Sequence, residues 1–288
     1  MSTRRTPEAL IDELHEKLEP IGRFAVAVSG GIDSLTLATL VARHWPGRTE
    51  LFHAVSPAVP GESTARLRAL ATANGWRLRL IDAQEFERAE YRSNPVDRCY
   101  FCKQSLYGAI ARVATAQMLS GTNADDFAEY RPGLIAAQEH QVRHPFAELS
   151  IGKAQVRAIA RLLGLGALSE LPASPCLSSR IETGIAIDPA MLRCVETAER
   201  LVRDRLARER LTAATVRCRV RASSVVIELD RAALDALDAE ARQALAQEIR
   251  VTAFDGAIGR TPVFAPYRNG SAFLVRAEQL QCTPASQP

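Results

Sequence analysis

The sequence lacks any long hydrophobic run. None of its apolar segments approaches the roughly 20 residues that a membrane-spanning helix requires, although the 288-residue chain is 47% hydrophobic overall. Residues 1–5 are polar and basic, and residues 7–19 are amphipathic rather than uniformly apolar. Such a start differs from the apolar core of a signal peptide. We therefore expect a cytoplasmic protein.

The sequence also lacks an excess of charge of either sign. Its 36 Lys and Arg residues are balanced by 33 Asp and Glu residues, which gives a formal net charge of +3. This balance argues neither for nor against nucleic acid, so any cationic function must come from local clusters. Because no strongly basic RNA-binding extension is visible either, nucleic acid is not an expected partner.

Cysteine is scarce, with six residues in the chain. This number is too small for a disulfide-dense scaffold, and grouped cysteines in a reducing compartment indicate metal or redox chemistry instead. Cys99 and Cys102 form a C-x-x-C pair, and Cys176 lies in the segment Pro-Cys-Leu-Ser-Ser-Arg of residues 175–180. Cys194, Cys218 and Cys282 stand alone in an expected helix, an expected strand and the tail, and we interpret them as structural.

Several interpretations of the grouped cysteines remain open. A zinc site needs four ligands, but no second C-x-x-C or paired histidine accompanies this one. A thioredoxin-like motif should follow the first strand of its domain, whereas Cys99 comes much later. An iron–sulfur cluster held by three cysteines leaves one iron without a protein ligand, free to bind sulfide or a substrate atom. The three could also be merely small buried residues.

The first part of the chain alternates apolar runs with helical spacing. Continuous apolar runs are typical of buried parallel strands, and a βαβα order favours a parallel sheet with helices on both faces. We predict an α/β domain over residues 1–170. Its expected strands are residues 24–28, 51–55, 77–81 and 117–120, and its expected helices are residues 35–43, 62–74, 103–115 and 153–163.

The pattern changes near residue 171. Residues 171–187 carry prolines and serines and are expected to form a loop or linker. Residues 188–288 are expected to form a smaller α+β domain, a typical domain size. It should contain a helix at 189–206 with Asp188 as N-cap, strands at 215–221 and 224–229, a helix at 232–249, and a frayed polar tail after Glu278.

A glycine-rich loop connects the first expected strand to the first helix that follows it. Its residues are Ser29, Gly30, Gly31, Ile32, Asp33 and Ser34. Two glycines allow a ligand to approach the backbone closely, and the free N–H groups of a helix start attract an anion. Ser29 and Ser34 can donate hydrogen bonds to phosphate oxygens. Asp33 beside a phosphate implies a bridging Mg²⁺.

The loop lacks the Gly-Lys-Ser/Thr ending of the Walker motif. It resembles instead the SGGxDS signature of the PP-loop, or N-type, ATP pyrophosphatases, whose fold is of the adenine nucleotide alpha hydrolase type. This resemblance implies that ATP is cleaved to AMP and pyrophosphate. Gly121 and Asp125, in a segment after an expected strand, and Lys153 resemble further nucleotide-binding elements of that superfamily.

Residues from about Ile21 to Ser271 resemble one family within this superfamily, the LarE sulfur-inserting enzymes of nickel-pincer cofactor synthesis. The most specific match is the segment 175–180 around Cys176. Three further segments match: residues 98–103, residues 121–133, which include Tyr130, and residues 267–271, which include Arg268. Single matching positions are Glu199, Arg217, Arg219 and Glu228.

The resemblance implies a specific reaction. ATP would adenylylate a carboxylate of pyridinium-3,5-biscarboxylic acid mononucleotide, and sulfur would then displace AMP to leave a thiocarboxylate. AMP is a far better leaving group than hydroxide, and a thiolate or sulfide is a strong nucleophile at neutral pH. In the family, the cysteine that matches Cys176 either gives up its own sulfur or helps to ligate a cluster. Because Cys99 and Cys102 are also present, the cluster type is our hypothesis, with a [4Fe–4S] cluster on these three cysteines.

The resemblance also suggests substrate residues and partners. Arg217 and Arg219 alternate to one face of a strand, and together with Arg268 they could clamp the substrate phosphate, although a solvated strand face is the simpler alternative. Ser179, Arg180, Glu199 and Glu228 are further candidates by their family positions. The family implies a homo-oligomer, such as a hexamer, and a sulfur donor. The alternatives are a PP-loop tRNA thiolase, an amidoligase like NAD or GMP synthetase, and a non-enzymatic ATP-binding or iron–sulfur carrier.

Overall fold

The chain is described here by a computed structural model covering residues 5–128, 131–172, 175–255 and 261–273. The tail beyond Glu278, Cys282 and Tyr130 lie outside the described residues. The chain divides into two compact units. The first comprises Met1–Arg88 and Cys99–Ser174, and the second comprises Ala89–Arg98 and Pro175–Pro288.

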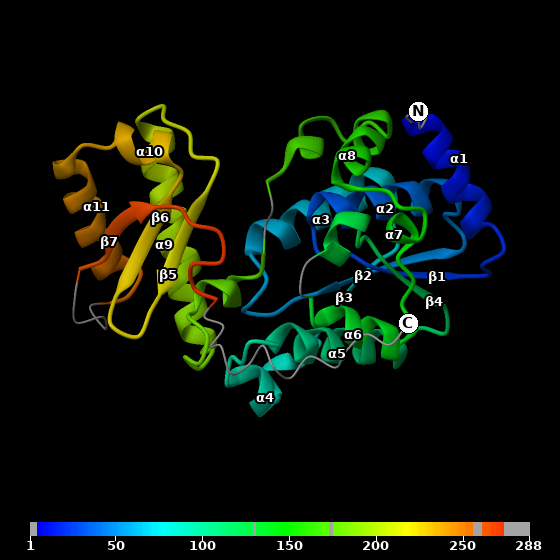
Figure 1. Ribbon diagram of the computed structural model, residues 1–288, viewed down its shortest axis with the longest axis horizontal. Helices are drawn as coiled ribbons and strands as arrows, with labels where there is room; N and C mark the ends of the chain where they lie inside the picture. The colour runs from blue at the N-terminus through cyan, green and yellow to red at the C-terminus, as the bar shows by residue number, and fades with distance from the viewer. Residues whose placement is uncertain (1–4, 129–130, 173–174, 256–260, 274–288) are drawn as a thin grey trace. The chain divides into compact units, whose positions relative to one another are not determined.

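The first unit is built on a four-stranded parallel sheet (Figure 1). Its strands are β1 (Phe24–Ala27), β2 (Thr49–Ala54), β3 (Leu78–Ile81) and β4 (Gln117–Ser120), in the order β3-β2-β1-β4. β1 pairs with β2 and β4 in parallel register and is buried at every position. This burial explains its continuous apolar run, and the structure confirms the predicted α/β class and parallel sheet.

Helices cover both faces of this sheet, as predicted. Successive residues of β1 point to opposite faces: Phe24 and Val26 join a core cluster with residues of α1, α2 and α8, whereas Ala25 and Ala27 join a cluster with residues of α5 and α6. The helices of the unit are α1 (Pro7–Leu18), α2 (Ile32–His44), α3 (Gly61–Asn74), α5 (Arg98–Ala111, whose first residue belongs to the second unit), α6 (Gly133–Glu139), α7 (Pro145–Glu148) and α8 (Lys153–Leu162). Short 3-10 turns are η1 (Glu85–Glu87), η2 (Ala124–Ala128) and η3 (Gly166–Glu170).

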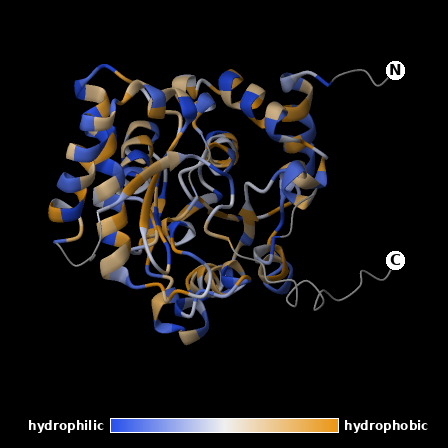
Figure 2. Ribbon diagram, turned by 60° about the vertical axis from the view of Figure 1, so that its left-hand side comes forward, coloured by the Kyte–Doolittle hydropathy of each residue, from blue (hydrophilic) through white to orange (hydrophobic). Residues whose placement is uncertain are grey.

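The second unit combines a three-stranded sheet with helices. Its strands are β5 (Val216–Val220), β6 (Val225–Leu229) and β7 (Val263–Pro266), with β5 antiparallel and β7 parallel to β6. Its helices are α4 (Ala89–Arg92), the 3-10 turn η4 (Leu177–Arg180), α9 (Pro189–Arg208), α10 (Arg231–Ala236) and α11 (Ala239–Thr252). Figure 2 shows that helices of the chain carry both hydrophobic and hydrophilic residues, as expected for helices with one buried face.

Two helix predictions in this unit have different outcomes. The side chain of Asp188 accepts a hydrogen bond from the Ala190 nitrogen and caps α9, as the sequence predicted. The single helix expected over residues 232–249 is wrong, because the structure has two helices there. Asp238 accepts from the Ala241 nitrogen and starts α11 anew. An Asp side chain competes with the helix backbone and favours such a start over continuation.

The segment Ala89–Arg98 is held within the second unit by side-chain hydrogen bonds. The Tyr91 hydroxyl lies 2.7 Å from the Ser178 Oγ, and both residues are buried. The Asn94 amide donates to the carbonyls of Glu182 and Ile185 at 2.9 Å each. Ten residues that precede Cys99 are therefore fastened to the loop that follows Cys176. In the part of the chain described, no helix is long and apolar enough to cross a membrane.

Candidate functional site

The loop between β1 and α2 adopts the turn that its glycines allow. Gly30 has a φ of +86°, a left-handed conformation that favours glycine. Gly31 is the N-cap of α2, and no side chain caps the helix start. The Ser34 hydroxyl donates to the Gly31 carbonyl at 3.0 Å and lies 3.1 Å from the Ser29 hydroxyl. The start of α2 thus presents uncapped N–H groups beside two hydroxyls, a common arrangement for binding phosphate.

The loop after β4 lies directly against this turn. A Cβ on Gly121 would be 2.6 Å from the Ser34 nitrogen and 2.7 Å from the Asp33 carbonyl carbon, so only glycine fits there. The two neighbouring strands end at the same edge of the sheet, which brings the two loops together. The sequence predicted Gly121 as a site residue, and the reason for a glycine is this backbone contact.

Replacing Gly121 with alanine should therefore weaken nucleotide binding. The clash is with backbone atoms, and such overpacking costs about 1–3 kcal/mol, so the loop of Ser29–Ser34 must shift and the dissociation constant for ATP should rise by about tenfold or more. Titration calorimetry with ATP measures this change. Gly47→Ala is the matched control, because a Cβ there meets nothing within 4 Å. Equal ATP affinity of the Gly121 and Gly47 variants would contradict the prediction.

Three predicted charged residues converge beside the loop. The Lys153 Nζ lies 2.5 Å from the Asp33 Oδ2, and the Lys153 backbone nitrogen donates to the Asp125 Oδ2 at 2.8 Å. A Cβ on Gly152 would lie 2.9 Å from the Asp125 Oδ1, so Asp125 also packs closely against the start of α8. Asp33, Asp125 and Lys153 come from three different elements, and the fold places them together.

Asp33 retains an oxygen that could serve a cation. Its Oδ1 atom is buried and has no hydrogen-bond partner among the described residues. Carboxylate oxygens are preferred ligands of Mg²⁺, which keeps several waters and shares phosphate oxygens of a nucleotide. The donor set therefore fits a nucleotide-bound Mg²⁺. Among the described residues, no group of three or more His, Cys, Asp or Glu side chains is arranged to hold a metal ion alone.

Arg66 was missed by sequence reasoning. It lies on α3, and its Nη1 donates to the Gly30 carbonyl at 3.0 Å. This contact brings a positive charge to the loop of Ser29–Ser34 from a helix that lies far from it in sequence. A local pattern could not reveal it, because α3 reaches the loop only through the fold.

The loop that carries Cys176 is organised by a buried ion pair. Arg180 and Glu199 are each 2% exposed, and the Arg180 Nε lies 2.8 Å from the Glu199 Oε1. The Arg180 Nη1 donates to the carbonyls of Pro175 at 2.7 Å and Cys176 at 3.2 Å. The Ser179 hydroxyl also donates to the Cys176 carbonyl at 2.8 Å. The backbone of Cys176 is therefore fixed, while its side chain remains half-buried.

Glu199 connects this loop to the sheet. Its Oε1 accepts from the Cys218 nitrogen at 3.0 Å, and its Oε2 accepts from Arg203 at 3.1 Å. Burial by itself raises the pKa of Glu199, but the charge and hydrogen bonds of Arg180 outweigh it and leave the pKa below its ordinary value. Glu199 is thus an ionised, buried anchor, and the sequence alone could not distinguish it from a surface carboxylate.

The predicted phosphate-clamp arginines lie in different surroundings. Arg219 is buried and pairs with the Glu228 Oε2 at 3.0 Å, and it also donates to the Ser179 carbonyl at 3.0 Å. Arg217 is buried, and desolvation together with the charge of Arg180 lowers its pKa to about 10. Arg268 is exposed. The neighbouring Ser271 hydroxyl donates to the Glu228 Oε1 at 2.6 Å, which brings the loop of Arg268 to the end of the sheet.

The remaining cysteines are divided between the two units. Cys99 is exposed and Cys102 half-buried, and both lie in the first turns of α5. Cys176 belongs to the other unit. Cys218 is fully buried, and burial raises the pKa of its thiol well above the ordinary value. Cys218 is therefore unsuited to act as a nucleophile, consistent with a structural role.

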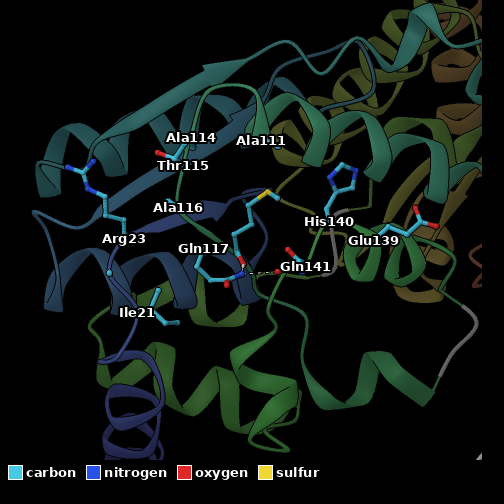
Figure 3. A pocket seen from close by; sticks show the side chains of 12 residues that line it. Ile21, Arg23, Ala111, Ala114, Thr115, Ala116, Gln117, Glu139, His140 and Gln141 are labelled. Carbon is cyan, nitrogen blue, oxygen red and sulfur yellow. Dashed lines mark hydrogen bonds between the residues drawn. The ribbon is translucent and has the colours of Figure 1, made fainter.

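A cavity of about 810 Å³ lies away from this chemistry (Figure 3). Arg23 and Gln117, at the amino-terminal ends of β1 and β4, line it together with His140 and Gln141. The loops of Ser29 and Gly121 follow the carboxyl ends of the same strands. Ligands of open α/β sheets bind outside the carboxyl ends, and none of the predicted site residues lines this cavity. We therefore place the candidate nucleotide site at the loops.

Comparisons with known proteins identify relatives over most of the chain. No family model matches the chain. An uncharacterized protein of Synechocystis sp. is 38% identical over 197 residues, covering 67% of this chain and 73% of the relative. The pyridinium-3,5-bisthiocarboxylic acid mononucleotide synthase of Lactiplantibacillus plantarum is 30% identical over 238 residues, covering 81% of this chain and 82% of the relative. This chain belongs to the LarE family. An uncharacterized protein of Methanocaldococcus jannaschii is a further relative, 28% identical over 186 residues.

Membership of the LarE family agrees with the resemblance found in the sequence. The most specific part of that resemblance was the segment 175–180 around Cys176. The matching positions Arg180, Glu199, Arg219 and Glu228 are all buried and ion-paired in the second unit.

Proposed function

We propose that this LarE-family protein is an ATP-dependent sulfurtransferase with a PP-loop domain. Its substrate would be pyridinium-3,5-biscarboxylic acid mononucleotide, and its product the corresponding thiocarboxylate in nickel-pincer cofactor synthesis. The observation that carries the proposal is the convergence of Asp33, Asp125 and Lys153 on the loop of Ser29–Ser34. The family and the name of the Lactiplantibacillus relative, a pyridinium-3,5-bisthiocarboxylic acid mononucleotide synthase, support the choice of substrate.

The first step would use this loop. Uncapped N–H groups at the start of α2 and the Lys153 ammonium bind the ATP phosphates, and Asp33 binds their Mg²⁺. A substrate carboxylate oxygen attacks the α-phosphorus, the bond to the β-phosphate oxygen breaks, and pyrophosphate leaves. Positive charge held in place beside the phosphates stabilises the charge that develops on the leaving group.

The second step would use the cysteines. A sulfur nucleophile attacks the activated carbonyl carbon, the carbon–oxygen bond to AMP breaks, and a thiocarboxylate remains. Arg180 and Ser179 hold the Cys176 backbone in one position for this attack. Cys99 and Cys102 are three residues apart at the start of α5 and thus share one side of the helix. We propose that they and Cys176 bind a [4Fe–4S] cluster, which would supply a sulfide on its fourth iron.

The test uses anaerobically purified full-length protein with ATP, Mg²⁺ and the mononucleotide substrate. We expect AMP and pyrophosphate to form only when the substrate is present, and a product to form in which sulfur replaces one oxygen. ATP cleavage that does not depend on the substrate would contradict the adenylylation step. Iron and acid-labile sulfide together with several products per chain support the cluster. Active protein without iron that loses H₂S from Cys176 would instead identify the sacrificial route.

A further inference from the structure

Arg98 is a buried cation without a hydrogen-bonded counterpart. The residue is 6% exposed. Its Nε and Nη1 atoms are covered and have no hydrogen-bond partner among the described residues. Its guanidinium carbon lies 5.7 Å from the centre of the Phe273 ring, which is a cation–π contact.

Such a group requires an anion. Buried charges in proteins are paired and hydrogen-bonded, because removing an ion from water costs far more than one aromatic contact returns. The other buried arginines among the described residues of this unit have oxygen partners: Arg180 donates to Glu199, Arg219 donates to Glu228, and Arg217 donates to the Val216 carbonyl. No ion pair between described residues includes Arg98. Its covered nitrogens are therefore suited to an oxygen ligand from outside the described chain.

The surroundings of Arg98 connect it to the loop of Cys176. Arg98 closes the segment 89–98, which Tyr91 fastens to Ser178 and Asn94 fastens to Glu182. Phe273 lies at the end of a turn that is joined to the same loop, because the Thr183 nitrogen donates to the Ala272 carbonyl at 3.0 Å. Asn94 carries a second buried polar atom without a partner, its Oδ1. Two residues of the segment 89–98 thus carry buried polar atoms without a partner, in the unit that also holds residues 176–183.

We propose that Arg98 binds an oxyanion of the substrate, a carboxylate or a phosphate. A guanidinium fork matches either group with two parallel hydrogen bonds. The inference rests on the proposed function for the identity of the substrate, but the anion site itself rests on the burial and the free nitrogens of Arg98. Arg98 is accordingly a substrate-binding residue of the unit that carries Cys176.

The test compares Arg98→Gln with the matched control Arg92→Gln in the full-length protein. Arg92 lies on the same segment but is exposed. Calorimetry measures binding of two probes, pyridine-3,5-dicarboxylate and inorganic phosphate. We expect one probe to bind about 10- to 100-fold more weakly to the Arg98 variant, the scale of a lost hydrogen bond to a charged group, and the control to match the wild type. Weaker binding of the dicarboxylate identifies a carboxylate site, and weaker binding of phosphate a phosphate site.

A second variant guards against misfolding. Arg98→Lys keeps the charge without the fork and should retain the native circular dichroism while raising the KM for the mononucleotide more than it lowers kcat. Unchanged affinity of Arg98→Gln for both probes, or a wild type that binds neither probe, overturns the anion site. A wild type that forms no thiocarboxylate would overturn the proposed function instead. The probe measurements would still decide whether Arg98 binds an anion.

Discussion

Replacing Cys176 with alanine should abolish thiocarboxylate formation while ATP still adenylylates the substrate and releases pyrophosphate. The residues proposed for the two steps lie in different units, because the loop of Ser29–Ser34 belongs to the first and Cys176 to the second. Without the Cys176 sulfur, neither the sacrificial nor the cluster route can deliver sulfur to the activated carboxylate. Product formation should fall by about a thousandfold or more, the scale of removing a catalytic nucleophile. Mass spectrometry of the small-molecule product and a pyrophosphate assay measure the two activities separately.

Cys194→Ala is the matched control for this experiment. Cys194 lies on α9 of the same unit, is half-buried, and its thiol pKa is raised by burial, so it is poorly suited to nucleophilic chemistry. The control should form thiocarboxylate as the wild type does. Thiocarboxylate formation by the Cys176 variant at the wild-type rate would show that another group delivers the sulfur.

The loop of Ser29–Ser34 and the strand before it were largely predictable from local sequence. β1 is buried on both faces, so its apolar run at residues 24–27 is visible without a structure. The turn that follows needs glycine for a φ of +86° at Gly30. The SGGxDS motif of residues 29–34 has a glycine at this position, so the sequence already showed it. Gly121 and Lys153 could be matched by resemblance. What the sequence could not show is that the Gly121 backbone touches Ser34 or that Arg66 reaches Gly30.

The second unit was less predictable because its charged residues pair over long sequence distances. Alternation correctly indicated that Arg217 and Arg219 share one face of a strand, but it could not decide between a phosphate clamp and a solvated strand face. The structure buries both residues and gives Arg219 a partner in Glu228, nine positions away on the next strand. The segment Ala89–Arg98 precedes α5 in sequence, yet Tyr91 and Asn94 fasten it to a loop nearly ninety residues later. Neither periodicity nor composition reports such contacts.

The pairing of Arg180 with Glu199 is another such long-range contact, and breaking it should strongly lower the stability of the second unit. Replacing Glu199 with alanine should destabilise the second unit by about 3–5 kcal/mol, the cost of removing one partner of a buried ion pair. The change leaves the Arg180 guanidinium buried without its carboxylate and the Cys218 N–H without its acceptor. Because Arg180 also donates to the Cys176 carbonyl, the loop of Cys176 should loosen as well.

Hydrogen exchange measured by mass spectrometry localises this effect, since peptides over β5 and residues 175–180 should lose protection while β1 keeps it. Tryptophan fluorescence would miss it, because both tryptophans, Trp45 and Trp76, lie in the first unit. Arg203→Ala is the matched control: Arg203 bonds the same carboxylate but is 40% exposed, and removing an exposed partner costs about 1 kcal/mol or less. Equal protection of β5 in the Glu199 and Arg203 variants would show that the buried pair does not hold the Cys176 loop.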